Sequence, residues 1–147
     1  MAARLLMVCT GNICRSPMAA GIAQDYGFRR MRNVEVRSAS VLGLVDKPAH
    51  KHAIKVMLEL EIDISAHRSQ PVTPEIVAWA DYILGMEINH SATLRERYPE
   101  ADDKILLLPT FGGLVEITDP LGGWRGRFRR CRDDIQRCTM AFVDQLG

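Results

Sequence analysis

The sequence predicts an α/β fold, a three-layer sandwich in which a four-stranded parallel sheet is flanked by helices. The first observation is that short apolar runs typical of buried strands alternate with amphipathic segments typical of helices. The second is length, because 147 residues correspond to one domain, expected to span residues 1–147. The third is composition, since 47% hydrophobic and 25% charged residues are ordinary for a globular chain.

The first elements follow from apolar patterning and from helix start and stop signals. Residues 5–8 (LLMV) form a continuous apolar run, as expected of a strand buried on both faces. Ser16 and Pro17 predict a helix start, with Ser16 as the N-cap. Apolar residues then recur at every fourth position: Met18, Ile22 and Tyr26. Gly27 is predicted to end this helix, and residues 34–38 form a second, weaker strand.

The rest of the chain repeats the alternation and adds two loops. The further predicted elements are a helix over residues 53–60, a short helix from Thr73-Pro74 to Trp79, a strand at 82–84, a helix over 88–98 and a strand at 105–108. Residues 40–48 form one loop. Residues 109–123 form a long loop with two Pro and four Gly, and a loop of this length is usually functional. The last helix begins at about residue 124 and carries one apolar stripe: Phe128, Cys131, Ile135, Cys138 and Phe142.

The segment from Cys9 to Arg15, here called the cradle loop, carries the strongest chemical signal. It lies between a predicted strand and a predicted helix, where backbone N–H groups and the helix N-terminus bind anions. Gly11 allows a tight curl, and Arg15 supplies a planar fork that matches two phosphate oxygens. This positive environment favours the thiolate form of Cys9, a nucleophile for phosphorus.

The spacing Cys-x5-Arg is not specific by itself. Residues 131–137 (CRDDIQR) also match it, but this segment contains two Asp and no Gly and lies in a predicted helix. It would therefore repel phosphate. The alternative interpretation is that Cys9 has no chemical role and only fills space as a small buried residue at a strand end. The strand–loop–helix context favours the catalytic interpretation.

The motif over residues 9–17 (CTGNICRSP) resembles the signature of the low-molecular-weight protein tyrosine phosphatases. Further motifs follow in that family's order: Ser38-Ala39, residues 63–69 (DISAHRS), residues 81–84 (DYIL) and Asp119-Pro120. The likeness covers nearly the whole chain, and it is greatest to bacterial members that accompany capsule and exopolysaccharide tyrosine kinases. The resemblance implies hydrolysis of phosphotyrosine through a phosphocysteine intermediate, without cofactor or metal. It also implies a monomer that acts on a tyrosine autokinase or its targets.

The resemblance also implies roles for individual residues. Cys9 is the nucleophile, Arg15 clamps the transition state, and Ser16 hydrogen-bonds the Cys9 sulfur, which competes with its use as an N-cap. The phosphate-binding residues are Thr10, Gly11, Asn12, Ile13, Cys14 and Arg15, with Asn12 also holding the loop. Asp119 acts first as acid and then as base. Glu116 lies three residues from Asp119 but lacks the following proline.

One departure from the family concerns the substrate walls. The family usually has an aromatic residue after Asp-Pro, whereas this chain has Leu121-Gly122-Gly123. The aromatic wall is therefore either missing or supplied by Trp124. Leu121 and, on the loop over residues 40–48, Leu44 are the candidate walls. Cys14 is a candidate redox partner for Cys9, as in relatives with this second cysteine, and its alternative is simple packing.

Two other functions share parts of this pattern. A thiol-dependent arsenate reductase of the same fold needs further cysteines, and only Cys131 and Cys138 remain. They follow the Asp-Pro loop, whereas related reductases carry theirs before it, and they lie on the apolar stripe. A non-catalytic phosphotyrosine reader is disfavoured because Cys9, Arg15 and Asp119 are all present.

Charge and cysteine usage limit the partners and the compartment. Nineteen Lys and Arg against 18 Asp and Glu leave +1, so no nucleic-acid partner is indicated. A basic run of five arginines opens the last helix and is interpreted as either a solvated face or a surface that steers phosphorylated tails: Arg125, Arg127, Arg129, Arg130 and Arg132. We expect no metal site, no membrane insertion and a cytoplasmic location, because metal-ligand spacing, an apolar span and a signal-peptide core are all lacking.

Overall fold

A four-stranded parallel sheet forms the centre of the computed structural model, which describes residues 1–146. The strands are β1 (Ala3–Cys9), β2 (Val34–Ser40), β3 (Tyr82–Gly85) and β4 (Ile105–Leu107). Their order across the sheet is β2-β1-β3-β4, and each neighbouring pair is parallel. The predicted four-stranded parallel sheet is therefore confirmed.

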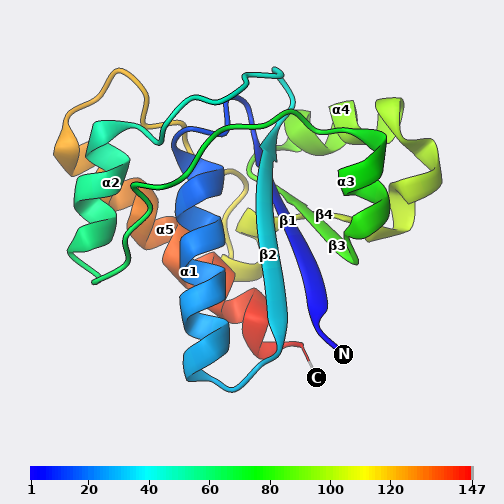
Figure 1. The fold of residues 1–147 in the computed structure, drawn as a ribbon, viewed down its shortest axis with the longest axis horizontal. Coiled ribbons are helices and arrows are strands. Elements are labelled where there is room, and N and C mark those ends of the chain that lie inside the picture. Colours follow the sequence, from blue (N-terminus) through cyan, green and yellow to red (C-terminus); the bar gives the residue numbers. More distant parts are fainter. Residues whose placement is uncertain (147) are drawn as a thin grey trace.

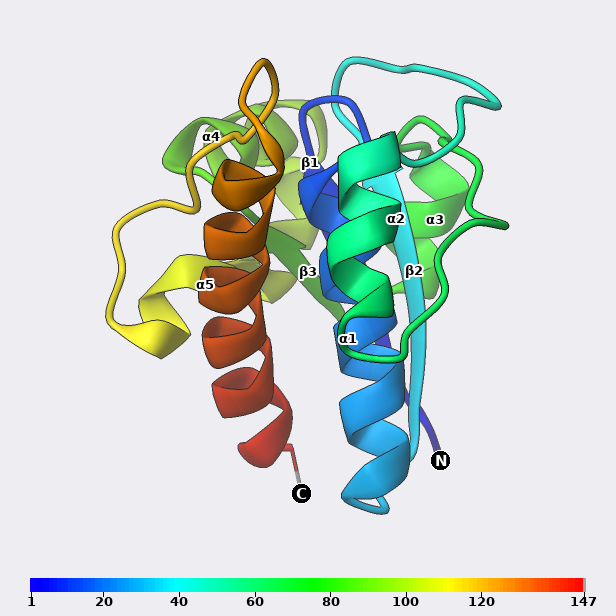
Figure 2. The same ribbon diagram turned by 90° about the vertical axis from the view of Figure 1, so that its left-hand side faces the viewer.

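Helices cover both faces of the sheet, which gives the three predicted layers. The helices are α1 (Arg15–Arg29), α2 (Lys51–Leu58), α3 (Pro74–Trp79), α4 (Ile88–Arg97) and α5 (Arg125–Asp144). Helices α1, α2 and α5 lie on one face and α3 and α4 on the other (Figure 1). The turned view places α1, α2 and α5 in front of the sheet (Figure 2). Two 3₁₀ helices, η1 (Pro99–Lys104) and η2 (Leu108–Gly112), flank β4.

Strand β1 is buried on both faces, as its continuous apolar run predicts. Leu5 and Met7 belong to the core beneath α1, α2 and α5, while Leu6 and Val8 belong to the core beneath α3 and α4. Alternate side chains of a strand point to opposite faces, so this one run supplies both cores. The strand ends at Cys9, at the carboxyl edge of the sheet, where ligands bind in open α/β folds.

Two predictions about α1 are wrong. Ser16 is not the N-cap, because the helix begins at Arg15 with Cys14 at the cap position and no side-chain cap bond. The Ser16 hydroxyl is instead bonded to side chains of the cradle loop. Gly27 does not end the helix, which continues to Arg29. This glycine is needed for close packing, since a Cβ there would lie 2.5 Å from Cγ2 of Val34.

Other boundaries differ less. Helix α3 begins at the predicted Thr73-Pro74, and Thr73 is its N-cap, with its hydroxyl accepting from the Ile76 N–H at 3.3 Å. Helix α2 ends at Leu58, two residues before the predicted end. The first part of the predicted loop over residues 109–123 belongs to the 3₁₀ helix η2, which ends at Gly112. The rest of that loop, residues 113–123, has no helix or strand. Among the described residues, no helix combines the length and apolar character needed to cross a membrane.

Candidate active site

A hollow of about 110 Å³ lies over the cradle loop and gathers three distant parts of the chain. Its lining residues are Cys9, Thr10, Gly11, Ile13, Cys14, Arg15, Leu42, Leu44, Asp119 and Leu121. Both predicted wall residues, Leu44 and Leu121, line it. Trp124 does not, and with 86% of its surface exposed it lies in solvent. In this structure Trp124 therefore supplies no wall, and the side chains that wall the hollow are aliphatic.

The Cys9 sulfur is surrounded by hydrogen-bond donors. The backbone N–H groups of Asn12 and Ser16 point at Sγ from 3.3 and 3.4 Å. The Ser16 hydroxyl lies 3.0 Å from the same sulfur. Because the Asn12 amide donates to Ser16 Oγ at 2.7 Å, the Ser16 proton is left to point at Cys9. Three donors around one sulfur stabilise a thiolate.

Asn12 fixes the shape of the cradle loop. It is fully buried and has a positive φ of 58°, a conformation that Asn tolerates better than most residues. Its Nδ2 donates to Ser16 and, at 2.9 Å, to Ser38 Oγ. Its Oδ1 accepts from the Gln70 N–H at 3.0 Å. The amide therefore ties the loop to β2 and to the segment that precedes α3.

The carbonyl groups of the cradle loop are bound from outside. The bonds run from Val41 N to Cys9 O (3.1 Å), Leu42 N to Thr10 O (3.0 Å), His67 Nε2 to Asn12 O (2.7 Å) and His50 N to Ile13 O (2.8 Å). The N–H groups of Gly11, Ile13, Cys14 and Arg15 have no acceptor in the described part of the chain. Because other segments bind the carbonyl groups of the loop, these four N–H groups remain free to donate to a bound anion.

Arg15 is nearly fully buried, with 1% of its surface exposed, and is held by several acceptors. Its Nη1 donates to Glu87 Oε2 at 2.6 Å and to the Ile117 carbonyl at 2.8 Å. Its Nη2 donates to Thr10 Oγ1 at 3.3 Å. The Nε–H has no protein acceptor among residues 1–146. A buried guanidinium needs such compensation. Three of its five N–H groups are bonded, so two donors, the Nε–H and the second Nη2–H, remain for a ligand.

His90 braces the opposite side of the cradle loop. The Glu87 N–H donates to its Nδ1 at 3.1 Å, so the hydrogen of the neutral ring lies on Nε2. That Nε2–H faces Thr10 Oγ1 at 2.9 Å. Burial and then the Arg15 charge lower the pKa of His90 to about 4. His90 is therefore neutral at neutral pH and acts as a fixed donor to Thr10.

Asp119 lies at the mouth of the hollow, with its side chain 44% exposed. One carboxylate oxygen lies 3.7 Å from Arg15 Nη2, and the other accepts from the Leu121 N–H at 3.0 Å. Glu116 does not line the hollow. A hydrogen bond with Glu87 raises the pKa of Glu116. Of the two candidate acids, Asp119 is the one that faces the cradle loop.

The remaining cysteines are buried thiols. Burial raises the pKa of Cys14 and of Cys131 to about 12. Cys138 lies in the core on α5, and its Sγ donates to the Pro109 carbonyl at 3.6 Å. Cys131 and Cys138 pack in the core as the apolar stripe predicts.

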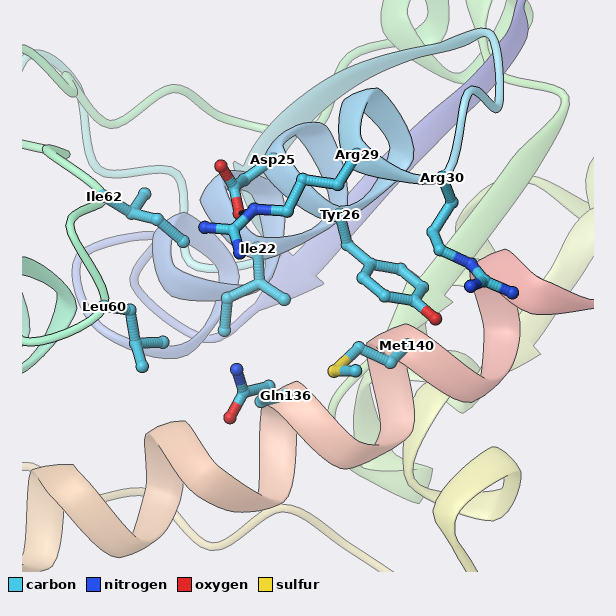
Figure 3. Close-up of a pocket in the computed structure, with 9 residues that line it drawn as sticks. All are labelled: Ile22, Asp25, Tyr26, Arg29, Arg30, Leu60, Ile62, Gln136 and Met140. Carbon is cyan, nitrogen blue, oxygen red and sulfur yellow. Dashed lines mark ion pairs between the residues drawn. The ribbon is translucent and has the colours of Figure 1, made fainter.

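A second hollow, of about 290 Å³, lies between α1 and α5 (Figure 3). It is lined by Ile22, Asp25, Tyr26, Arg29, Arg30, Leu60, Ile62, Gln136 and Met140. Arg29 and Asp25 form an ion pair of 2.9 Å at its rim. It is lined by neither cysteine nor histidine, whereas the predicted nucleophile, Cys9, lines the smaller hollow.

The sequence predicted no role for four side chains that hold the cradle loop, although Ser38 and His67 lie in the family motifs named above. Glu87 and His90 hold Arg15 and Thr10, while Ser38 and His67 hold Asn12. A signal was available for the first pair, because they follow β3. This strand is parallel to β1, and the carboxyl ends of adjacent parallel strands meet at one edge.

Comparison with known proteins agrees with this geometry. A family model described as low molecular weight phosphotyrosine protein phosphatase matches residues 4–147. The fold and site are thus those of a phosphatase, which is a hydrolase. The chain belongs to the low molecular weight phosphotyrosine protein phosphatase family, as the resemblance in its motifs predicts.

The relatives include proteins named for two different substrates. A protein-arginine-phosphatase of Geobacillus stearothermophilus is 40% identical over 145 residues, covering 97% of this chain and 95% of that protein. The low molecular weight protein-tyrosine-phosphatase Wzb of Escherichia coli K12 is 35% identical over 143 residues, covering 97% and 95%. A low molecular weight protein tyrosine phosphatase structure from T. tengcongensis superposes with a TM-score of 0.94 at 34% identity, covering 99% and 100%.

Proposed function

We propose that this protein hydrolyses phosphotyrosine in proteins through a phosphocysteine intermediate. The partner proposed from the sequence is a tyrosine autokinase of exopolysaccharide production, or a target of such a kinase. The observation that carries the proposal is the pair of features in one hollow: a cysteine sulfur held by three donors, and aliphatic walls above it.

In the first step the Cys9 thiolate attacks phosphorus, so that an S–P bond forms while the P–O bond to tyrosine breaks. The free N–H groups of the cradle loop and the two unbonded N–H groups of Arg15, on Nε and Nη2, donate to the phosphoryl oxygens. Asp119, at the mouth, gives its proton to the leaving phenolate oxygen.

In the second step water attacks the phosphocysteine. The Asp119 carboxylate takes a proton from this water, so that inorganic phosphate forms and the S–P bond breaks. The electron pair returns to the Cys9 sulfur, where the Ser16 hydroxyl 3.0 Å away donates to the departing thiolate.

The walls favour an aryl phosphate over phosphoarginine. Ile13, Leu42, Leu44 and Leu121 offer methyl groups to a substrate, which suits a phenyl ring. A phosphoguanidinium brings several N–H donors, and each donor buried without an acceptor costs about 1–3 kcal/mol. Asp119 is the one carboxylate lining this hollow, so it is the one charged acceptor available to the N–H groups of a phosphoguanidinium.

Phosphoarginine is the second candidate substrate, because the 40% identical relative is named for it. The deciding experiment compares two peptides of the same sequence, one with phosphotyrosine and one with phosphoarginine. We expect a higher kcat/KM for phosphotyrosine. Ile13→Thr, which adds one hydroxyl to the wall, should move the ratio toward phosphoarginine. A wild-type preference for phosphoarginine would overturn the proposed substrate.

Metal independence follows from the thiol mechanism. Hydrolysis of p-nitrophenyl phosphate should survive EDTA and be blocked competitively by vanadate, which mimics five-coordinate phosphorus. Loss of activity on chelation, with recovery on adding zinc or magnesium, would contradict the thiol mechanism.

Cys14 is proposed to protect Cys9 from over-oxidation. Peroxide converts the Cys9 thiolate to a sulfenic acid, which condenses with the Cys14 thiol to give a disulfide and water. After one peroxide dose and then dithiothreitol, wild type should regain activity and Cys14→Ser should not. Equal recovery would leave Cys14 a packing residue only.

A further inference from the structure

The five arginines at the start of α5 divide into two groups with different surroundings. Arg129 and Arg132 pair with Glu59 at 2.6 and 2.7 Å, which ties α5 to the end of α2. Arg125, Arg127 and Arg130 pair with no carboxylate in the described part of the chain. Two of the five arginines therefore stabilise the packing of α5 on α2. The other three, here called the uncommitted arginines, carry charges without a carboxylate partner in this part of the structure.

Two of the uncommitted arginines line a hollow of their own. It measures about 250 Å³ and is lined by Thr118, Arg127, Arg130, Cys131 and Asp134. Thr118 precedes Asp119, the residue at the mouth of the reaction hollow. Because adjacent Cα atoms are about 3.8 Å apart, the two hollows adjoin the same short stretch of backbone.

We propose that this hollow, here called the flanking subsite, binds an anionic side chain of the polypeptide whose phosphotyrosine reacts at Cys9. This inference rests on the proposed function and adds a determinant of substrate choice. An extended chain spans about 3.3–3.6 Å per residue, so a side chain two to four residues from the phosphotyrosine can reach across the backbone at Thr118.

The chemistry of the flanking subsite complements that of the reaction hollow. The walls of the reaction hollow are aliphatic, so they distinguish an aryl group but not the charge of its neighbours. Two guanidinium forks and the Thr118 hydroxyl donate to carboxylate or phosphate oxygens. Asp134 is the one opposing charge that lines the flanking subsite, and it lies one helical turn beyond Arg130.

The experiment uses phosphotyrosine peptides that differ at one position, placed two, three or four residues to either side of the phosphotyrosine. That position carries Gln, Glu or phosphoserine, so that carboxylate and phosphate are tested separately. At the best position we expect kcat/KM of wild type to rise about three- to tenfold over the Gln peptide, a size typical of partly exposed ion pairs. The preference should shrink as salt is raised.

Three kinds of variant assign the preference to the flanking subsite. Arg127→Gln and Arg130→Gln should each reduce the ratio of acidic to neutral peptide, and the double variant should bring it near one. Asp134→Asn should increase the ratio. Arg137→Gln removes the same charge about 10 Å beyond Arg130 along α5 and should leave the ratio unchanged.

The possible failures are distinguishable. Inability of wild type to hydrolyse p-nitrophenyl phosphate would contradict the proposed function. Hydrolysis with equal kcat/KM for all peptides would overturn the flanking subsite alone. An equal loss of preference in Arg137→Gln would also overturn it, because net charge rather than this hollow would then be responsible.

Discussion

Ser16 and Ser38 provide a matched pair at the scale of single residues. Both hydroxyls accept from the Asn12 amide, at 2.7 and 2.9 Å, but only Ser16 also contacts the Cys9 sulfur. Ser16→Ala should slow breakdown of the phosphocysteine about 10- to 100-fold, since a hydrogen bond to a charged group contributes about 1.5–3 kcal/mol. Rapid-mixing kinetics with p-nitrophenyl phosphate should then show a burst followed by slow turnover.

Ser38→Ala is the control for this prediction. It removes the other acceptor of Asn12 Nδ2 without touching the sulfur, so formation and breakdown of the phosphocysteine should slow together and no new burst should appear. A burst of the same size in both variants would assign the effect to Asn12 rather than to the sulfur contact.

Asp119 also gives a prediction at this scale. Asp119→Asn should slow phosphate esters with poor leaving groups about 10²–10⁴-fold, because these need a proton from the acid. Esters with good leaving groups need little protonation and should be slowed much less. Single-turnover rates over a series of substituted phenyl phosphates measure the difference. Equal slowing across the series would exclude Asp119 as the acid.

The neutrality of His90 is a third prediction for a single residue. Its pKa of about 4, lowered from 6.5 by burial and by Arg15, means that the ring stays uncharged as the pH falls to 5. The unfolded chain takes up this proton near pH 6.5, so His90 makes stability fall as the pH drops from about 6.5 to about 4. Ring resonances in an NMR titration should remain those of the Nε2–H form at pH 5. Titration near 6.5 in the folded protein would show that the contact with Thr10 is not fixed.

At the scale of elements, the contact of α1 with β2 depends on Gly27. A Cβ there would meet Cγ2 of Val34 at 2.5 Å, so Gly27→Ala should lower the free energy of unfolding by about 1–3 kcal/mol. Val34→Ala in the same chain should recover part of the loss. Gly126 in α5 is the control, since a Cβ there meets nothing within 4 Å, and Gly126→Ala should stabilise by up to about 1 kcal/mol. Urea unfolding of wild type and these three variants tests the signs.

At the scale of the whole molecule, Glu59 joins two helices that lie about 70 residues apart in the chain. Hydrogen bonds from Arg129 and then Arg132 lower the pKa of Glu59 from 4.5 to about 2. Because the folded-state pKa is the lower one, this stabilisation is complete above about pH 4.5 and is lost as the pH falls toward 2. Glu59→Gln should therefore unfold at lower urea than wild type at pH 7, with the gap closing below pH 4.5. A gap independent of pH would mean that packing rather than charge explains the loss.

The sequence by itself determined the parallel sheet, the order of its elements and the core of the site. A short continuous apolar run that ends at a turn is typical of a strand buried on both faces, and a strand–loop–helix with Cys9, Gly11 and Arg15 defines an anion cradle through local geometry. Those signals lie within a few residues of one another, which is why they can be read without coordinates.

Tertiary structure alone decided which groups hold the cradle loop and which of the arginines remain uncommitted. Ser16 could serve as a helix cap or as a partner of Cys9, and only the approach of Asn12 selects the second. His90 hydrogen-bonds Thr10, which lies 80 residues away in the chain, and Glu59 accepts from Arg129, which lies 70 residues away. Such contacts depend on how helices and strands pack against one another, and no periodicity or spacing in the chain encodes them directly.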